Sequence, residues 1–283
     1  MESAALADSA TAAMMAVAAS SFVVSWLCYF GSRSFSSALF KVYRAMPPDE
    51  KAAWDTRVVS SIHALVSFVG AVWSMVRVAS LVAEVGPEAA FIRGANMLIE
   101  TFFAISIGYF LQDFLVIVIV RGALWSLPDL VHHTIAVAGL VVCLSTQTFL
   151  FYTMWAMLGE ISTPLLNLRY ICSKLGVTVP AIDYLFVASF FTSRPVNMVI
   201  NLGHALRYYS SWSHLSAANL QFGIGLAFAA LQFYWGYLIV RAIIDTLWPP
   251  APAGPGAAKH ANAQDAAATA TLVAATQFDP KLD

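Results

Sequence analysis

The sequence predicts an all-α, polytopic membrane protein with about seven transmembrane helices. Of its 283 residues, 59% are hydrophobic and only 11% are charged, and the mean hydropathy is +0.72. Soluble domains carry about 25% charged and 45–50% apolar residues, so this composition lies well outside that class. Long apolar segments recur along the chain, each close to the roughly 20 residues that a helix needs to cross a bilayer.

Seven segments have this character, at residues 11–30, 58–83, 97–120, 131–152, 153–171, 182–202 and 215–247. No basic residues precede the first segment, so it is predicted to be an N-terminal transmembrane anchor (residues 1–30) rather than a signal peptide. A basic cytosolic loop at 31–57 and a helical domain at 58–247 follow. Residues 248–283 are rich in Pro, Ala and Gly, which predicts a disordered cytosolic tail.

Basic residues concentrate in alternate loops between these segments. The first loop holds five, at Arg33, Lys41, Arg44, Lys51 and Arg57. The loops on the other side offer only Arg93 and Arg207. The positive-inside rule therefore predicts a multi-pass protein with a lumenal or external N-terminus and a cytosolic C-terminus.

Charge and cysteine usage argue against two other classes of protein. The net charge of −1 and the lack of a basic block give no reason to expect nucleic acid. Cys28, Cys143 and Cys172 lie far apart, without metal-binding spacing or a disulfide framework. We expect them to be buried hydrophobic residues and expect no metal ion.

Polar and ionisable residues inside the apolar segments recur at helical spacing. Such residues are costly in hydrocarbon and face the interior of a bundle. The stripes consist of His63, Ser67, Gly70, Ser74 and Arg77; of Ser106, Tyr109 and Asp113; of Glu160, Thr163 and Asn167; and of Arg194, Asn197, Asn201 and His204. Together they favour a polar-lined, lipid-accessible cavity enclosed by six of the helices. The alternative is that each stripe only joins neighbouring helices through ion pairs and hydrogen bonds.

Two adjacent histidines, His132 and His133, open the fourth segment close to Asp129. On a helix they point about 100° apart, so both can face a cavity but cannot form a flat clamp. Histidine acts as a general base, a nucleophile or a metal ligand near neutral pH. A metal would need further ligands from other helices, for which Glu160, Asp113 or His63 are candidates.

These residues carry a resemblance to the TLC-domain family (the TRAM, LAG1 and CLN8 homology proteins), over residues 58–247. The carriers are the Tyr109–Asp113 run, Trp125 with Asp129, the histidine pair and the Gly159–Arg169 run. The last run is most similar to the branch typified by TLC domain-containing protein 4. The similarity to the ceramide synthases, which transfer an acyl group from acyl-CoA to a sphingoid base, is more distant.

The resemblance implies that His132 and His133 would be the catalytic pair of an acyltransferase. The chain departs from the ceramide synthases in the next segment, where Gly159, Glu160 and Thr163 stand in place of a His-Asp pair and a second Asp. The basic run that precedes the synthase motif is also replaced, by a run starting at Arg121. These departures disfavour acylation of sphingosine but leave other acyl chemistry open.

Three functions follow as hypotheses. The first is lipid homeostasis, through an acyl lipid bound in the helical cavity of an endoplasmic-reticulum protein. The second is an acyl-CoA-dependent lipid acyltransferase, in which the catalytic residues would be His132, His133, Glu160 and Asp113. The third is a chaperone or cargo receptor for membrane proteins, although the last residues, Phe278–Asp283, form neither a dilysine nor a lumenal retention signal.

For the lipid-binding hypotheses, the residues expected to line the cavity are His63, Arg77, Tyr109, Asp129, Thr163, Asn167, Arg194, Asn197 and Asn201. No cofactor is expected, since acyl-CoA would be a substrate. The expected partners are membrane lipids and, for an enzyme, acyl-CoA, and a homodimer is left open.

Overall fold

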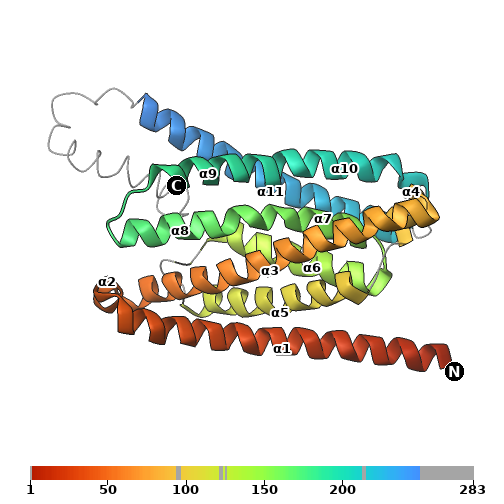
Figure 1. Cartoon of the computed structure of the whole chain (residues 1–283), viewed down its shortest axis with the longest axis horizontal. Coiled ribbons are helices and arrows are strands. Elements are labelled where there is room, and N and C mark those ends of the chain that lie inside the picture. Colours follow the sequence, from red (N-terminus) through yellow and green to blue (C-terminus); the bar gives the residue numbers. More distant parts are fainter. Residues whose placement is uncertain (1, 94–96, 121–123, 125, 212–214, 249–283) are drawn as a thin grey trace.

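The computed structural model describes residues 2–93, 97–120, 124, 126–211 and 215–248. All regular elements of this part of the chain are helices, which lie side by side as a bundle (Figure 1). This confirms the all-α, polytopic membrane class. The tail from residue 249, the run beginning at Arg121, and Trp125 lie outside the described residues.

Within the described residues, five helices are long and apolar enough to cross a membrane. They are α1 (Glu2–Leu39), α3 (Pro48–Val85), α5 (Met97–Val120), α6 (Leu127–Thr146) and α11 (Leu215–Leu247). α1 and α3 extend beyond the predicted segments at both ends, because a helix can continue through polar residues outside the apolar stretch. The segment predicted as a loop, 31–57, is therefore largely helical.

Two further rods are built from shorter pieces joined by irregular turns. One consists of α7 (Leu150–Ala156), the 3-10 turn η2 (Met157–Ile161) and α8 (Ser162–Lys174). The other consists of α9 (Pro180–Phe191), the π-helical turn η3 (Thr192–Val196) and α10 (Asn197–Arg207). In Figure 1 the pieces of each rod follow one another along a single line. These rods correspond to the fifth and sixth predicted segments.

The boundary between the fourth and fifth segments differs from the prediction. The sequence placed it at residues 152 and 153, but α6 ends at Thr146 and α7 already begins at Leu150. Between them, Gln147 and Phe149 have positive φ angles of 53° and 63°. The turn is hidden from hydropathy because the residues after it, Phe149–Tyr152, are apolar or aromatic.

Short helices connect the rods. α2 (Lys41–Ala45) joins α1 to α3, α4 (Pro87–Arg93) follows α3, and η4 (Tyr209–Ser211) follows α10. At the α2 joint, the Tyr43 hydroxyl donates to the Asp55 carboxylate at 2.7 Å and Ser32 donates to the same group at 2.9 Å. Burial, followed by the hydrogen bond to Asp55, raises the pKa of Tyr43, so the hydroxyl stays protonated and keeps donating.

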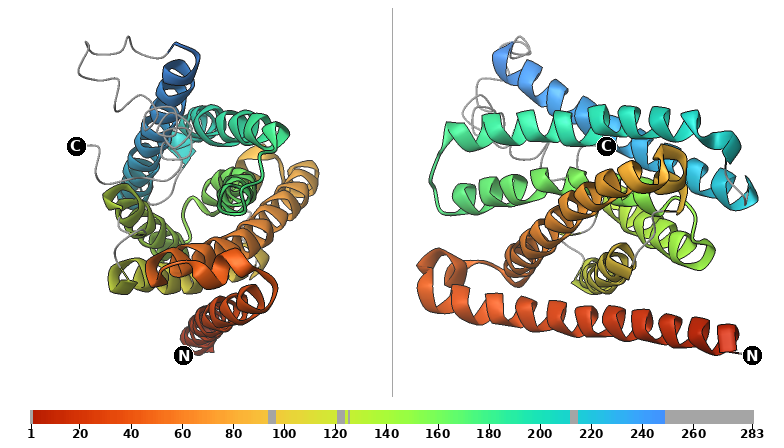
Figure 2. Two further views of the ribbon diagram at one scale, coloured as in Figure 1. Left: turned by 90° about the vertical axis from the view of Figure 1, so that its left-hand side faces the viewer. Right: turned by 45° about the vertical axis from the view of Figure 1, so that its right-hand side comes forward.

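The rod formed by α7, η2 and α8 packs against α3, α5, α6, α9 and α10, and it lies near the middle of the end-on view (Figure 2, left). α1 lies at the edge of the bundle in the same view and packs mainly on α5. Gly108 of α5 makes this contact close, because a Cβ there would meet the backbone of Ala18 and Phe22. Small residues at such crossings are typical of membrane helices.

Candidate functional site

A cavity of about 100 Å³ lies between α5, α6, the α7–η2 piece, the η3–α10 piece and α11. One water molecule needs roughly 10–15 Å³ by the same measure, so this space exceeds the need of a single water. Much of the wall is apolar, including Phe110, Ile135, Ala136, Leu140, Met198, Ile224 and Phe228. The polar part of the wall includes His132, Glu160, Ser193, Arg194, Asn201, Gln221 and Gln232.

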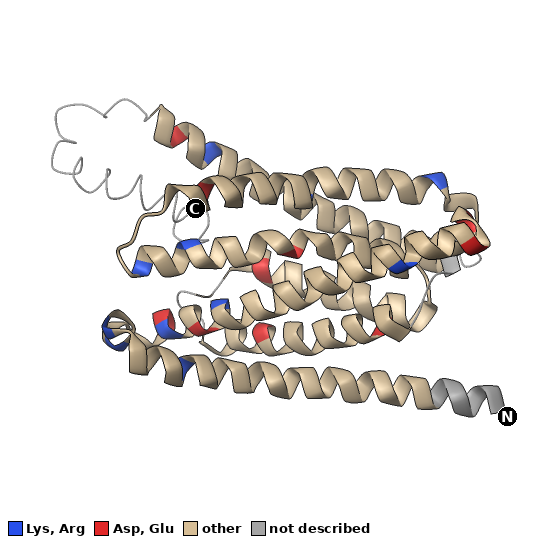
Figure 3. Ribbon diagram, viewed as in Figure 1, with Lys and Arg blue, Asp and Glu red and all other residues tan. Residues whose placement is uncertain are grey.

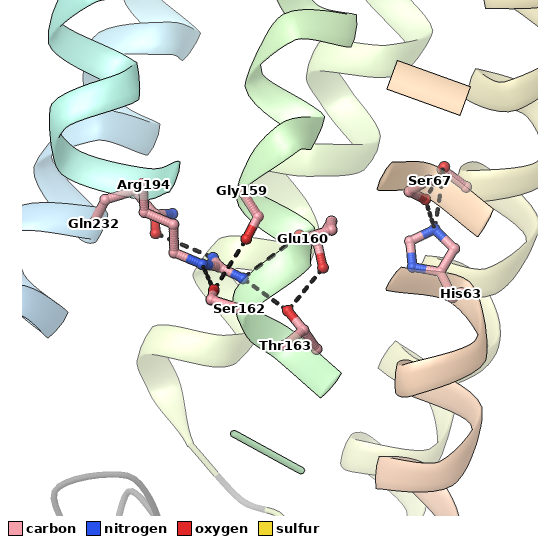
Figure 4. A network of polar contacts seen from close by, with 9 residues as sticks. His63, Ser67, Gly159, Glu160, Ser162, Thr163, Arg194 and Gln232 are labelled. Carbon is pink, nitrogen blue, oxygen red and sulfur yellow. Dashed lines mark hydrogen bonds and ion pairs between the residues drawn. The ribbon is translucent and has the colours of Figure 1, made fainter. Parts of the chain in front are cut away.

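Arg194 is the centre of the polar part of this wall (Figure 4). Its Nε donates to the Ser162 hydroxyl at 2.8 Å, its Nη1 to Gln232 Oε1 at 3.1 Å and its Nη2 to the Thr163 hydroxyl at 2.8 Å. Nη2 also lies 3.7 Å from Glu160 Oε1. The hydroxyl of Thr163 donates to the other Glu160 oxygen at 2.9 Å, so it bridges the two charges.

Both charged residues lie where a rod departs from regular α-helix. Glu160 belongs to the 3-10 turn η2 and Arg194 to the π-helical turn η3, next to Pro195. Irregular backbone at membrane depth is tolerated where it is buried in protein or lines a cavity. π-turns also re-aim side chains and occur frequently at functional sites. The turns η2 and η3 therefore face each other across the site. Each divides its rod into shorter helices, so neither rod is one continuous α-helix.

Four polar atoms of cavity-lining residues are buried without a hydrogen-bond partner in the part of the chain that the structure describes. They are His132 Nδ1, Ser193 Oγ, Gln221 Oε1 and Gln232 Nε2. Buried polar atoms are nearly always paired, and each unpaired one costs about 1–3 kcal/mol. These four atoms are available to a molecule bound in the cavity.

His133 is fully engaged elsewhere. Its Nδ1 lies 2.6 Å from the carbonyl oxygen of Asp129, and its Nε2 lies 2.8 Å from Asp113 Oδ2. A carbonyl only accepts, so Nδ1 carries a proton. The contact between Nε2 and the Asp113 carboxylate fixes the other side of the ring. The two predicted catalytic histidines thus have different environments: His133 joins α6 to α5, while His132 lines the cavity.

A second polar cluster lies on α3 and α5 (Figure 4). His63 Nε2 is 3.0 Å from the Ser67 hydroxyl and 3.1 Å from the Ser106 hydroxyl. The His63 ring stacks on Tyr109, with a centroid distance of 3.9 Å. Neither His63 nor Tyr109 is among the cavity-lining residues.

The remaining predicted residues mostly join helices. Asn167 donates to the Arg57 carbonyl at 3.0 Å, which ties α8 to α3. Asn197 accepts from the indole of Trp155 at 2.8 Å. Asn201 lines the cavity and donates to the carbonyl of Tyr152 at 2.9 Å. Arg77 is exposed on the outer face of α3, away from the cavity. The polar stripes therefore line the cavity at some positions and join neighbouring helices at others.

The sequence analysis missed the polar residues of the last helix. Gln221, Gly225, Phe228 and Gln232 all line the cavity and follow one another at spacings of four, three and four. This is the period of one face of an α-helix, so the pattern was present in the sequence. The missed Ser193 offers no such signal, because its position depends on the π-turn.

Replacing Asp113 with Leu is expected to destabilise the fold by about 3–5 kcal/mol, because it leaves the buried His133 without its carboxylate. The double variant Asp113→Leu/His133→Leu should be less destabilised than the sum of the two single variants. Unfolding in detergent of the four proteins of this cycle measures the coupling. Asp245→Leu, at an exposed pair with Arg241, is the control and should change stability by no more than about 1 kcal/mol. Additive single effects would contradict a buried, coupled pair.

Comparison with known proteins places the chain in a family. Residues 53–241 match the family model of the TLC domain (TRAM, LAG1 and CLN8). The chain is 26% identical to TLC domain-containing protein 4-B of Xenopus laevis over 154 residues, covering 54% of the chain and 56% of that relative. It is 25% identical to TLC domain-containing protein 1 of Gallus gallus over 190 residues, covering 63% and 73%. It is 23% identical to TLC domain-containing protein 4 of Homo sapiens over 233 residues, covering 80% and 82%.

The match to the first of these relatives thus spans little more than half of that protein's length. No solved structure matches the chain. The family model covers well over half of the sequence, including the cavity-lining turns of both interrupted rods and most of α11. The chain belongs to the TLC-domain family of membrane proteins.

Proposed function

We propose that this protein binds one acyl lipid in its cavity and thereby acts in lipid homeostasis. The observation that carries the proposal is the composition of the cavity wall. Apolar side chains such as Ile135, Met198 and Phe228 line it together with polar atoms that have no partner. An acyl lipid has the matching chemistry, because its chain is apolar and its head or linkage hydrogen-bonds.

The surrounding bilayer supplies such a ligand at high concentration. The cavity is bounded by α5, α6 and α11, which are apolar enough to span the membrane. The cavity accommodates the polar group and the first part of the chain, and the rest of the chain lies among apolar helix surfaces. The polar group of a bound lipid would then pair with some of the four unpaired polar atoms and remove their cost.

We propose the endoplasmic reticulum as the location, from the resemblance to lipid-handling TLC proteins. The proposed orientation has a lumenal N-terminus and a cytosolic C-terminus. Lys and Arg gather at the end of the bundle where α2 joins α1 to α3 and where α8 ends (Figure 3). The end of α11 lies on the same side, whereas α1 starts at the opposite end. The positive-inside rule assigns the basic end to the cytosol.

Filling the cavity should abolish lipid binding. Ala136 of α6 lines the cavity, so Ala136→Phe is expected to remove most of the lipid that co-purifies with the wild type. Ala138, two residues along the same helix, is exposed, and Ala138→Phe serves as the matched control. Native mass spectrometry of the two detergent-purified variants measures bound lipid. Equal lipid occupancy in both would contradict the proposal.

Acyl transfer is the second candidate, and the position of His132 favours it. This histidine lines the cavity, and its Nδ1 is buried without a partner, which leaves an imidazole nitrogen for a reacting group. His132 would then act as the base or nucleophile toward an acyl donor. His133, held by Asp113 and the Asp129 carbonyl, would only position the helix that carries His132.

Incubation with acyl-CoA tests this candidate. An acyltransferase should give an acyl adduct or an acylated lipid that His132→Ala abolishes. Ala138→Phe, on the lipid-facing side of the same helix, should leave the product unchanged. Intact-mass measurement and lipid analysis of the same reactions provide the readout. A wild-type protein that retains its lipid but yields neither adduct nor product would contradict catalysis and leave lipid binding in place.

A further inference from the structure

We propose that the cavity takes a lipid with two separate polar groups, one at its head and a hydroxyl part-way along its chain. This inference rests on the proposed lipid binding and names the class of lipid. It is carried by the distance between two polar groups of the cavity wall, by the apolar wall between them, and by a buried acceptor at the far end.

The polar residues of the cavity wall fall into two groups, which we call the head end and the tail end. Contacts hold each group together. At the head end, Arg194 reaches both Gln232 and Glu160. At the tail end, the side-chain nitrogen of Gln221 lies 3.1 Å from the hydroxyl oxygen of Thr153. The full head end is His132, Glu160, Ser193, Arg194 and Gln232, and the tail end is Thr153, Asn201 and Gln221.

The two ends lie at different heights of the bundle. Gln221 and Gln232 are eleven residues apart on the continuous helix α11, which is about 16 Å along its axis. On α6, His132 is seven residues from Gly139, whose carbonyl accepts from Gln221, and this spacing is about 10 Å. Along both interrupted rods the head end falls on the turns η2 and η3, and the tail end on α7 and α10, which lie on the same side of those turns (Figure 1).

The wall between the two ends is largely apolar. On α6, Ile135 and Ala136 lie between His132 and Gly139, and they line the cavity. On α11 and α10, the cavity-lining residues between the two ends are Ile224, Gly225, Phe228 and Met198. No single polar group can meet both ends across this wall, whereas a hydrocarbon chain fits it.

The tail end presents a buried acceptor. The side-chain nitrogen of Gln221 donates to the Gly139 carbonyl at 3.3 Å, and a carbonyl only accepts, so the other atom of the amide is the oxygen. This oxygen is buried without a hydrogen-bond partner among the described residues. An unbranched hydrocarbon chain would pass it and leave it unpaired. A hydroxyl on the chain would donate to it.

The head end presents the complementary atom. The Gln232 oxygen accepts from Arg194, so the unpaired atom of Gln232 is its NH₂ group, a donor. The head group of the lipid can accept from it. A fully extended chain advances roughly 1.2 Å per single bond, so the separation of about 10–16 Å between the ends corresponds to roughly 8–13 bonds. The hydroxyl therefore belongs near the middle of a long acyl or alkyl chain.

The test is a competition among three uncharged probes of one chain length: octadecan-1-ol, octadecane-1,2-diol and octadecane-1,12-diol. Each displaces the lipid that co-purifies with the detergent-purified protein, and native mass spectrometry reports occupancy. We expect the 1,12-diol to bind about tenfold more tightly than the other two, because it alone pairs the buried acceptor. The 1,2-diol controls for the addition of a hydroxyl that stays at the head end.

The variant Gln221→Leu should remove this preference. It deletes the acceptor at the tail end, so the 1,12-diol loses its advantage over octadecan-1-ol, while octadecan-1-ol still binds. Asn219 lies two residues away on the exposed surface of α11, and Asn219→Leu is the matched control. It should keep the tenfold preference of the wild type.

The outcomes separate this inference from the function on which it rests. If the wild type binds the three probes equally, or if its preference for the 1,12-diol persists in Gln221→Leu, the inference is overturned and lipid binding stands. If none of the probes binds and Ala136→Phe loses no lipid, lipid binding itself fails, and the inference with it. The comparison of the three probes on the wild type is decisive even if Gln221→Leu does not fold.

Discussion

The structure depends on one constraint: within the bilayer no water is available to a polar group, so each must find its partner inside the protein. Arg194 shows how the chain meets this constraint. Its guanidinium is surrounded by Ser162, Thr163, Gln232 and Glu160, which come from two rods and from α11. The same bonds that neutralise and satisfy Arg194 hold η2, η3 and α11 around the cavity, so the site and the fold share one set of contacts.

The unpaired atoms around the cavity are exceptions to this constraint. The protein satisfies Arg194, the His133–Asp113 pair and several asparagines, yet leaves an unpaired atom on His132, Ser193, Gln221 and Gln232 along the wall of the cavity. A bound molecule with an apolar chain and a polar group would pair with part of this set. The cavity would then act as a receptor for a lipid, with turnover only if His132 also reacts.

Much of the fold could be predicted from the sequence, because hydropathy and helical period are local properties. The buried stripe of α3, from His63 through Ser67 and Ser74, followed from spacing alone. The next step of that stripe did not, because Arg77 and Val78 both continue it at allowed spacings. Packing buries Val78 and leaves Arg77 exposed.

The contacts of a side chain are harder to predict from the sequence than the helix face on which it lies. A helical pattern gives the face of α6 on which His133 lies, but only the packing of α5 against α6 brings His133 to Asp113. This contact occupies His133, whereas His132 lines the cavity. The turn at Gln147–Phe149 and the π-turn that carries Arg194 are also invisible to hydropathy, because each departs from the regular period that defines the signal.

The central claim is that a lipid occupies the cavity, and an electron cryomicroscopy map of the protein in lipid nanodiscs tests it most directly. We predict an elongated density in the cavity, with its polar end within hydrogen-bonding distance of His132 or Gln232. A map in which the side chains have closed the cavity, or in which it holds only ordered water bridging these residues, would contradict the claim.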